Sequence, residues 1–68
     1  MADIRIVKRQ YRTSVVPLSR QGEAWLILSM EHTVLKELKV NHYISIDSEA
    51  TEELIISMER SGLSVEVV

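Results

Sequence analysis

The clearest alternation of apolar and polar positions lies in residues 48–61 and has the period of a helix. Its apolar side chains recur on one side at about 100° per residue, at Ala50, Leu54, Ile55 and Met58. Asp47 or Ser48 offers a side-chain oxygen as the N-cap, and glutamates in the first turns suit the positive end of the helix dipole. The pattern predicts a main helix over residues 48–61 with one face turned to the core.

The end of this helix is marked by Gly62. Glycine readily adopts the left-handed backbone conformation that commonly follows a last helical turn. Leu63 would then pack back onto Met58, as in a Schellman motif. We therefore expect a positive φ at Gly62.

Strands are predicted on both sides of this helix. Residues 42–47 alternate in polarity, with Ile44 and Ile46 on one face, and residues 63–68 alternate with β-branched side chains. Two strands joined through a helix by short connections run parallel. We expect these two strands to be parallel, whether or not they are neighbours in the sheet.

The first part of the chain is also rich in strand-forming residues. Ile4, Ile6 and residues 13–18 predict one long or bent strand with a polar centre. Pro17 cannot donate a ladder hydrogen bond, so this strand is expected to lie at an edge or to bend there.

Residues 24–30 are apolar on both faces and predict the next strand, in the interior of the sheet. Gln21-Gly22 then predicts the hairpin turn that precedes it. Residues 33–39 fit two structures: a short helix capped by Thr33, which we favour, or a strand. Together these elements predict one α+β domain over residues 1–68, with a single sheet of about four strands in the order β-β-α-β-α-β and the main helix packed across one face.

The composition leaves little material for catalysis. The chain has no cysteine, so it has no thiol nucleophile, disulfide or thiolate zinc site. Its two glycines belong to no phosphate-binding loop, and its serines lack the Gly-x-Ser-x-Gly setting. His32 and His42 fit no metal-ligand spacing, and we interpret them as surface residues flanking a short helix, although Glu31 and both histidines could still meet in space. We expect a protein that is not an enzyme, with no catalytic residue, metal or cofactor.

Membrane insertion and secretion are not expected either. The longest apolar run, Ala24–Leu28, is far shorter than the ~20 residues of a membrane helix. The N-terminus lacks the basic-then-apolar layout of a secretion signal. We expect a cytoplasmic location.

Charge is distributed unevenly along the chain. Residues 1–22 hold five basic residues against one acidic residue, whereas residues 23–68 hold nine acidic against three basic. Such asymmetry fits two binding faces or two merely solvated faces, and both interpretations stay open.

A protein-binding surface is predicted on the 48–61 helix. Ile56 points away from the apolar stripe and is flanked by the charged residues Glu49, Glu52 and Arg60. An apolar side chain inside a charged ring is a typical interface anchor, although single exposed isoleucines are also common. The expected function is that of a small regulatory or inhibitory protein, of the kind that phages and mobile elements encode, acting on a larger host or viral protein.

Nucleic acid is the alternative partner. Basic side chains cluster around a ring that could stack on a base, at Lys8, Arg9, Tyr11, Arg12 and Arg20, the last placed at the tip of the expected hairpin. The acidic pI of about 5.6 opposes this function unless the acidic residues face away. Basic residues on a strand pair also serve simply to discourage edge aggregation.

Self-association is a further expectation. A short chain without disulfides, ending in a valine-rich strand, is expected to have a strand edge covered by a second copy or by a partner. The sequence therefore predicts that a second copy of the chain, in a homodimer, is one possible partner.

Overall fold

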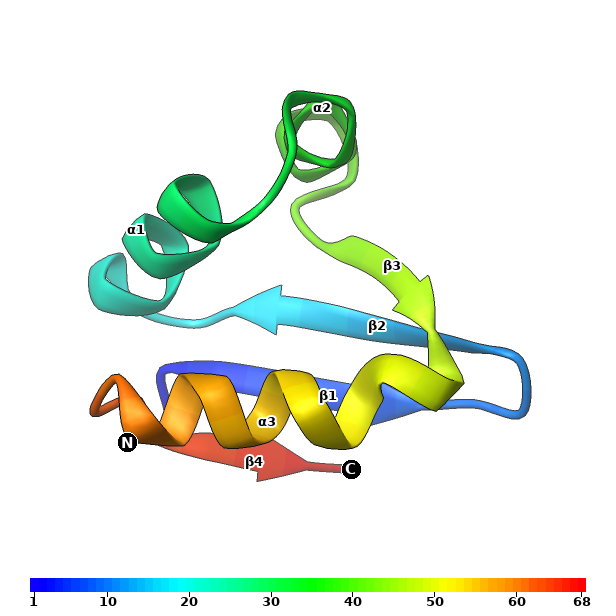
Figure 1. The fold of residues 1–68 in the computed structure, drawn as a ribbon. Coiled ribbons are helices and arrows are strands. Elements are labelled where there is room, and N and C mark those ends of the chain that lie inside the picture. Colours follow the sequence, from blue (N-terminus) through cyan, green and yellow to red (C-terminus); the bar gives the residue numbers. More distant parts are fainter.

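Four strands form one mixed sheet in the order β3-β2-β1-β4 (Figure 1). A computed structural model describes residues 1–68. The strands are β1 (Ile4–Lys8), β2 (Arg12–Pro17), β3 (Ile44–Asp47) and β4 (Val65–Val67). The helices are α1 (Arg20–Ser29), α2 (His32–Asn41) and α3 (Thr51–Arg60), and α3 continues from the 3-10 turn η1 (Ser48–Ala50). The predicted α+β class, with a four-stranded sheet and a helix across one face, is confirmed.

The strand directions follow from three ladders. β1 pairs antiparallel with β2, β2 pairs antiparallel with β3, and β1 pairs parallel with β4. β3 and β4 therefore run parallel, with β2 and β1 between them. The direction predicted for two strands connected through a helix is confirmed.

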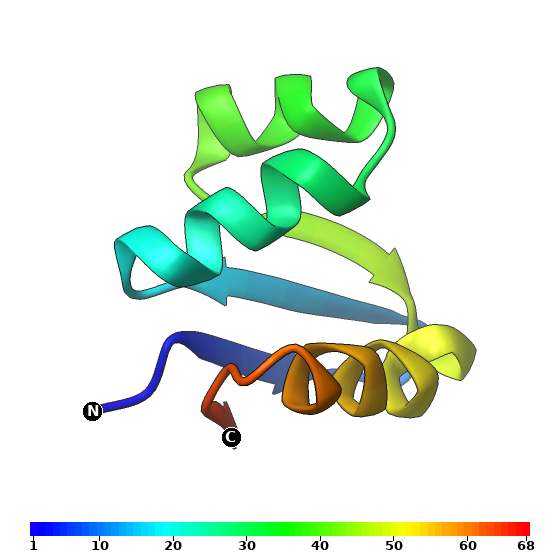
Figure 2. The same ribbon diagram turned by 60° about the vertical axis from the view of Figure 1, so that its left-hand side comes forward.

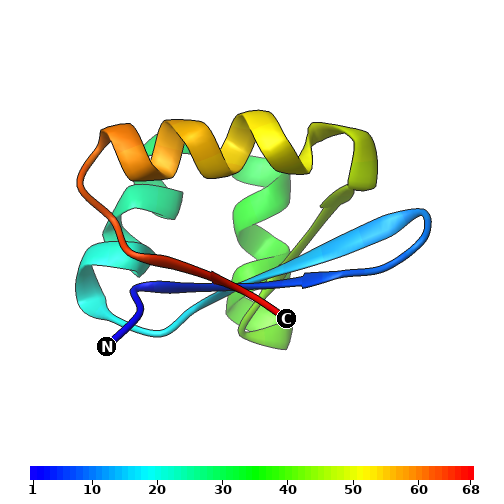
Figure 3. The ribbon, with the colours of Figure 1, turned by 90° about the horizontal axis from the view of Figure 1, so that it is seen from below.

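The sheet has one covered face and one open face. Alternate residues of the strands, such as Ile6, Val15 and Ile44, are buried under the helices. The residues between them, such as Arg5 and Ser14, point to the opposite face, away from α3 (Figure 3). This period of two decides which side of each strand enters the core.

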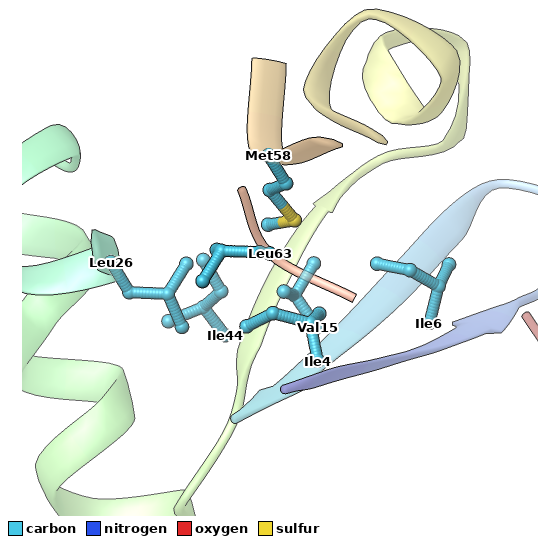
Figure 4. Packing of buried hydrophobic residues seen from close by; sticks show 7 residues of the cluster. All are labelled: Ile4, Ile6, Val15, Leu26, Ile44, Met58 and Leu63. Carbon is cyan, nitrogen blue, oxygen red and sulfur yellow. The ribbon is translucent and has the colours of Figure 1, made fainter. Parts of the chain in front are cut away.

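The core is a single cluster of seven buried side chains (Figure 4). Its members are Ile4, Ile6, Val15, Leu26, Ile44, Met58 and Leu63. Burying one such side chain contributes about 1.5–3 kcal/mol relative to exposure. The strands supply four of the seven, so the core sits on the covered face, between the sheet and helices α1 and α3.

The end of α3 has the predicted geometry. Gly62 has a φ of 89°, and its N–H donates to the carbonyl of Glu59 at 3.0 Å. The N–H of Leu63 donates to the carbonyl of Met58 at 3.1 Å. These two bonds are those of a Schellman motif, and Leu63 and Met58 both lie in the core.

The N-terminal segment differs from the prediction. Residues 4–17 form the hairpin β1–β2 and not one long strand, and the polar centre is the turn between the two strands. Pairing lets Ile6 and Val15 enter the same core from adjacent strands, which a single strand would not achieve. β2 is an interior strand, so an edge position for Pro17 is wrong. Pro17 is tolerated because the ladder with β3 already ends at Val15.

Residues 20–29 form a helix, so the predicted strand over 24–30 and the hairpin turn at Gln21-Gly22 are wrong. Ser19 is the N-cap, and its Oγ accepts from the Gly22 N–H at 3.0 Å. A Cβ at Gly22 would overlap the backbone oxygen of Asp3, so the glycine serves a close approach and not a turn. A continuous apolar run does not distinguish a buried strand from a helix.

Residues 33–39 belong to a helix, as favoured, and α2 extends it to His32–Asn41. It ends at His42, which has a left-handed φ of 65° and donates its N–H to the Leu38 carbonyl at 2.9 Å. None of the helices has the length and apolar character that crossing a lipid bilayer requires.

Candidate protein-binding surface

The outward side of α3 gathers one apolar and several charged side chains. Ile56 stands at its centre and is 48% exposed. The exposed charged residues around it lie three or four positions away along the helix, or one turn further in η1. We call this the α3 face, and its members are Glu49, Glu52, Glu53, Ile56, Glu59 and Arg60. The structure thus brings together the four residues predicted from the sequence, and Glu53 and Glu59 extend the set.

The orientation of α3 explains why Ile56 stays outside. Met58 is fully buried, and Leu54 and Ile55 pack against the core cluster. With 3.6 residues per turn, a helix that turns these positions to the sheet points Ile56 away from it. The exposure of Ile56 therefore follows from the packing of its neighbours.

A hollow of about 340 Å³ adjoins the α3 face. Its lining residues come from η1 and α3, from strand β3 and from the C-cap of α1. Figure 2 shows the arrangement of these segments. Its lining is mostly apolar, from Met30, Ile46, Ala50 and Leu54, with Glu53 and Ser57 at its border. The sequence did not reveal this hollow because it depends on Met30, which was assigned to a strand. An apolar recess beside an exposed isoleucine enlarges the surface that a partner can cover.

A chain of hydroxyl groups fixes the start of α3. The Thr51 hydroxyl donates to Thr13 Oγ1 at 2.9 Å, and the Ser48 hydroxyl donates to the Arg9 carbonyl at 2.8 Å. The contact of 3.1 Å between Thr13 and Ser48 must then have Thr13 as its donor, since each hydroxyl has one proton. This chain ties η1 and α3 to β2 and to the hairpin turn. It therefore sets the position of the first charged residues of the α3 face.

Most of the predicted basic cluster gathers at the tip of the β1–β2 hairpin. Lys8, Arg9, Tyr11 and Arg12 lie there, and Tyr11 is 75% exposed. The Arg12 guanidinium is engaged, since it donates to Ser45 Oγ at 3.1 Å and to the Ser45 carbonyl at 2.8 Å. Arg20 is the first residue of α1, beyond the other end of β2, so its predicted place at the hairpin tip is wrong.

One carboxylate has a shifted pKa, and it lies in the N-terminal segment. The Ser19 hydroxyl donates to Asp3 Oδ1 at 2.6 Å and the Ser64 N–H donates to Asp3 Oδ2 at 2.9 Å. These two hydrogen bonds, with the hydroxyl as the larger cause, hold the pKa of Asp3 below its usual value. Asp3 thereby joins the N-cap of α1 to the residue that precedes β4.

His32 and His42 stand at the two ends of α2, both exposed, as the sequence suggested. No three or more His, Cys, Asp or Glu side chains are arranged so that they could hold a metal ion. Both histidines instead line a groove between α1 and α2.

Comparison with known protein families, with characterised proteins and with solved structures finds no significant match to this chain. Function must therefore be inferred from the surfaces of the molecule.

Proposed function

We propose that this chain is a small non-enzymatic regulatory or inhibitory protein that binds a larger host or viral protein through the α3 face. The observation that carries the proposal is the half-exposed Ile56, surrounded by charged side chains and adjoining an apolar hollow. Tight interfaces typically have this anatomy, an apolar centre that is desolvated on binding and a charged rim that stays wet.

The α3 face also indicates the chemistry of its partner. Four of its charged residues are glutamates and only Arg60 is basic. A complementary surface offers an apolar recess for Ile56, bordered by lysine or arginine side chains. Such charges mainly accelerate association and exclude wrong partners, whereas burial of the isoleucine supplies affinity.

Partner capture with two matched double variants tests the proposal. Ile56→Ala with Glu52→Lys removes the anchor and reverses one rim charge on the α3 face. Leu28→Ala with Glu31→Lys makes the same changes at exposed positions in and after α1. A partner captured by the wild type should bind the first variant at least about tenfold more weakly and the second unchanged. Equal binding by both variants would contradict the proposal.

A second candidate function is nucleic-acid binding at the hairpin tip. It is favoured by one observation, the gathering of Lys8, Arg9 and an exposed Tyr11 in residues 8–12, a segment that contains no acidic residue and has Asp47 opposite Arg12 on the neighbouring strand. Lys8 and Arg9 are the informative positions, because Arg12 already donates to Ser45.

A salt titration separates the two functions. Binding to a duplex or single strand through phosphate contacts weakens steeply as salt rises. Lys8→Ala with Arg9→Ala would then abolish it, and the α3 variant would bind as well as the wild type or better. Absence of any salt-dependent binding would exclude this second function.

A further inference from the structure

A groove of about 630 Å³ runs between α1 and α2. Ile27, Leu35 and Leu38 provide its apolar lining, and Ile27 is 49% exposed. This α1–α2 groove is within the size range of binding clefts in proteins. Leu38 packs partly against the core, but α2 contains no fully buried residue and leaves its apolar side chains partly open along the groove.

The border of the groove is basic. Two lysines, Lys36 and Lys39, line it against one acidic residue, Glu23, and His32 and His42 are its other polar side chains. A surface complementary to the groove would therefore present an apolar side chain surrounded by carboxylates. The same molecule presents such a surface, the α3 face, where Ile56 stands among four glutamates.

We propose that the α3 face of one copy docks in the α1–α2 groove of a second copy. Ile56 enters the apolar lining, and the glutamates meet Lys36 and Lys39. The two surfaces of one chain cannot meet each other, because buried Met58 and the Thr51–Thr13 hydrogen bond hold α3 on the sheet with Ile56 outward. Intermolecular contact is the remaining way to pair them.

This contact joins two different surfaces, so it allows either a closed dimer with two such contacts or an open chain of copies. It also covers the face that we propose for the larger partner. Self-association and partner binding then compete for the α3 face. Without the partner, a second copy of the chain covers this face. The self-association itself does not depend on the proposed partner and is tested without it.

Charge reversal on each surface tests the contact. The groove variant carries Lys36→Glu and Lys39→Glu, and the helix variant carries Glu49→Lys and Glu52→Lys, all at exposed positions. Sedimentation velocity of the wild type should show a weight-average mass that rises with concentration to at least twice the monomer mass. Each variant alone should stay monomeric, because like charges then face each other. An equimolar mixture of the two should assemble again, because opposite charges are restored.

Three controls separate this contact from general effects of charge or folding. Lys8→Glu with Arg9→Glu changes the net charge as the groove variant does, but at the hairpin tip, and should self-associate like the wild type. Ile27→Asp, within the groove, should abolish assembly, whereas Leu28→Asp at the next residue, 87% exposed and outside the groove, should not. Circular dichroism verifies that each variant is folded.

A wild type that stays monomeric at every concentration would overturn the proposal. So would assembly that survives both charge reversals, which would place the contact elsewhere, such as the outer edge of β4. A mixture of the two variants that fails to assemble would also overturn it. None of these outcomes bears on capture of a larger protein, which is measured separately.

Discussion

Helices α2 and α3 are both ten residues long, yet they are attached to the sheet very differently. α3 buries Met58 and Thr51, donates a hydrogen bond into β2, and continues directly into the residues leading to β4. α2 buries no residue fully and contacts chiefly β3. The core of seven side chains includes Met58 of α3 and no residue of α2. One helix therefore stabilises the fold, and the other keeps apolar surface available along a groove.

The largest expected effect comes from the core contact of α3. Met58→Ala should reduce the free energy of unfolding by about 2–5 kcal/mol, because it leaves a cavity under the helix. Leu38→Ala on α2 removes a partly buried side chain that packs against the core from outside and should cost about 1 kcal/mol. Urea denaturation measures both. Equal losses would show that α2 is attached as firmly as α3.

A smaller effect is expected from the hydroxyl chain. Thr13→Val should cost about 1–3 kcal/mol, because the Thr51 donor and the Ser48 acceptor both lose their partner inside the protein. Thr33→Val at an exposed position of α2 makes the same chemical change and should stay within about 0.5 kcal/mol of the wild type. Thermal unfolding compares the two. If Thr13→Val is as harmless as its control, the chain of hydroxyls does not hold α3.

Substitutions at the ends of α3 and α2 should change the stability of the fold in opposite directions. Gly62→Ala places a Cβ on a left-handed residue and should cost about 1 kcal/mol, with Gly62→Val costing more. His42→Gly relieves the same conformation at the end of α2 and should stabilise the fold by up to about 1 kcal/mol. Chemical denaturation of the single variants tests this. An unchanged midpoint in Gly62→Val would contradict the described helix end.

The weakest effect concerns Asp3, which joins the N-cap of α1 to the residue before β4 through its hydrogen bonds with Ser19 and Ser64. Its pKa is lower in the folded state, so its ionised form stabilises the fold above the ordinary aspartate pKa of about 3.9, and this contribution is lost as pH falls through the lowered value. Asp3→Asn should therefore melt below the wild type near neutral pH, and the difference should shrink in acid. A difference in melting temperature that is constant with pH would contradict this.

Local sequence signals account for the part of the fold around α3. The helical stripe, the Gly62 end and the alternation in β3 and β4 each depend on neighbouring residues, and so does the grouping of Ile56 with Glu52 and Arg60. The α1 region was missed because its apolar run has no decisive period. Ser19 as an N-cap was the available signal. The role of Gly22 depends on the backbone of Asp3, which lies far away in the sequence and cannot be found from local pattern.

The hollow beside the α3 face and the α1–α2 groove were missed for the same reason. Both are lined by residues of the segment assigned as a strand, Met30 in one and Ile27 in the other. A surface formed between two elements depends on how they pack, which local sequence does not reveal. A surface on a single helix can be predicted from the helical periodicity of its residues.

The central claim is that the α3 face binds a larger protein while the rest of α3 holds the fold. Its most direct test is titration calorimetry of the captured partner with the wild type and with Ile56→Ala, beside the unfolding free energy of each. We predict that the variant binds at least about tenfold more weakly, while its stability stays within about 0.5 kcal/mol of the wild type. Unchanged affinity, or an unfolded Ile56→Ala variant, would contradict the account.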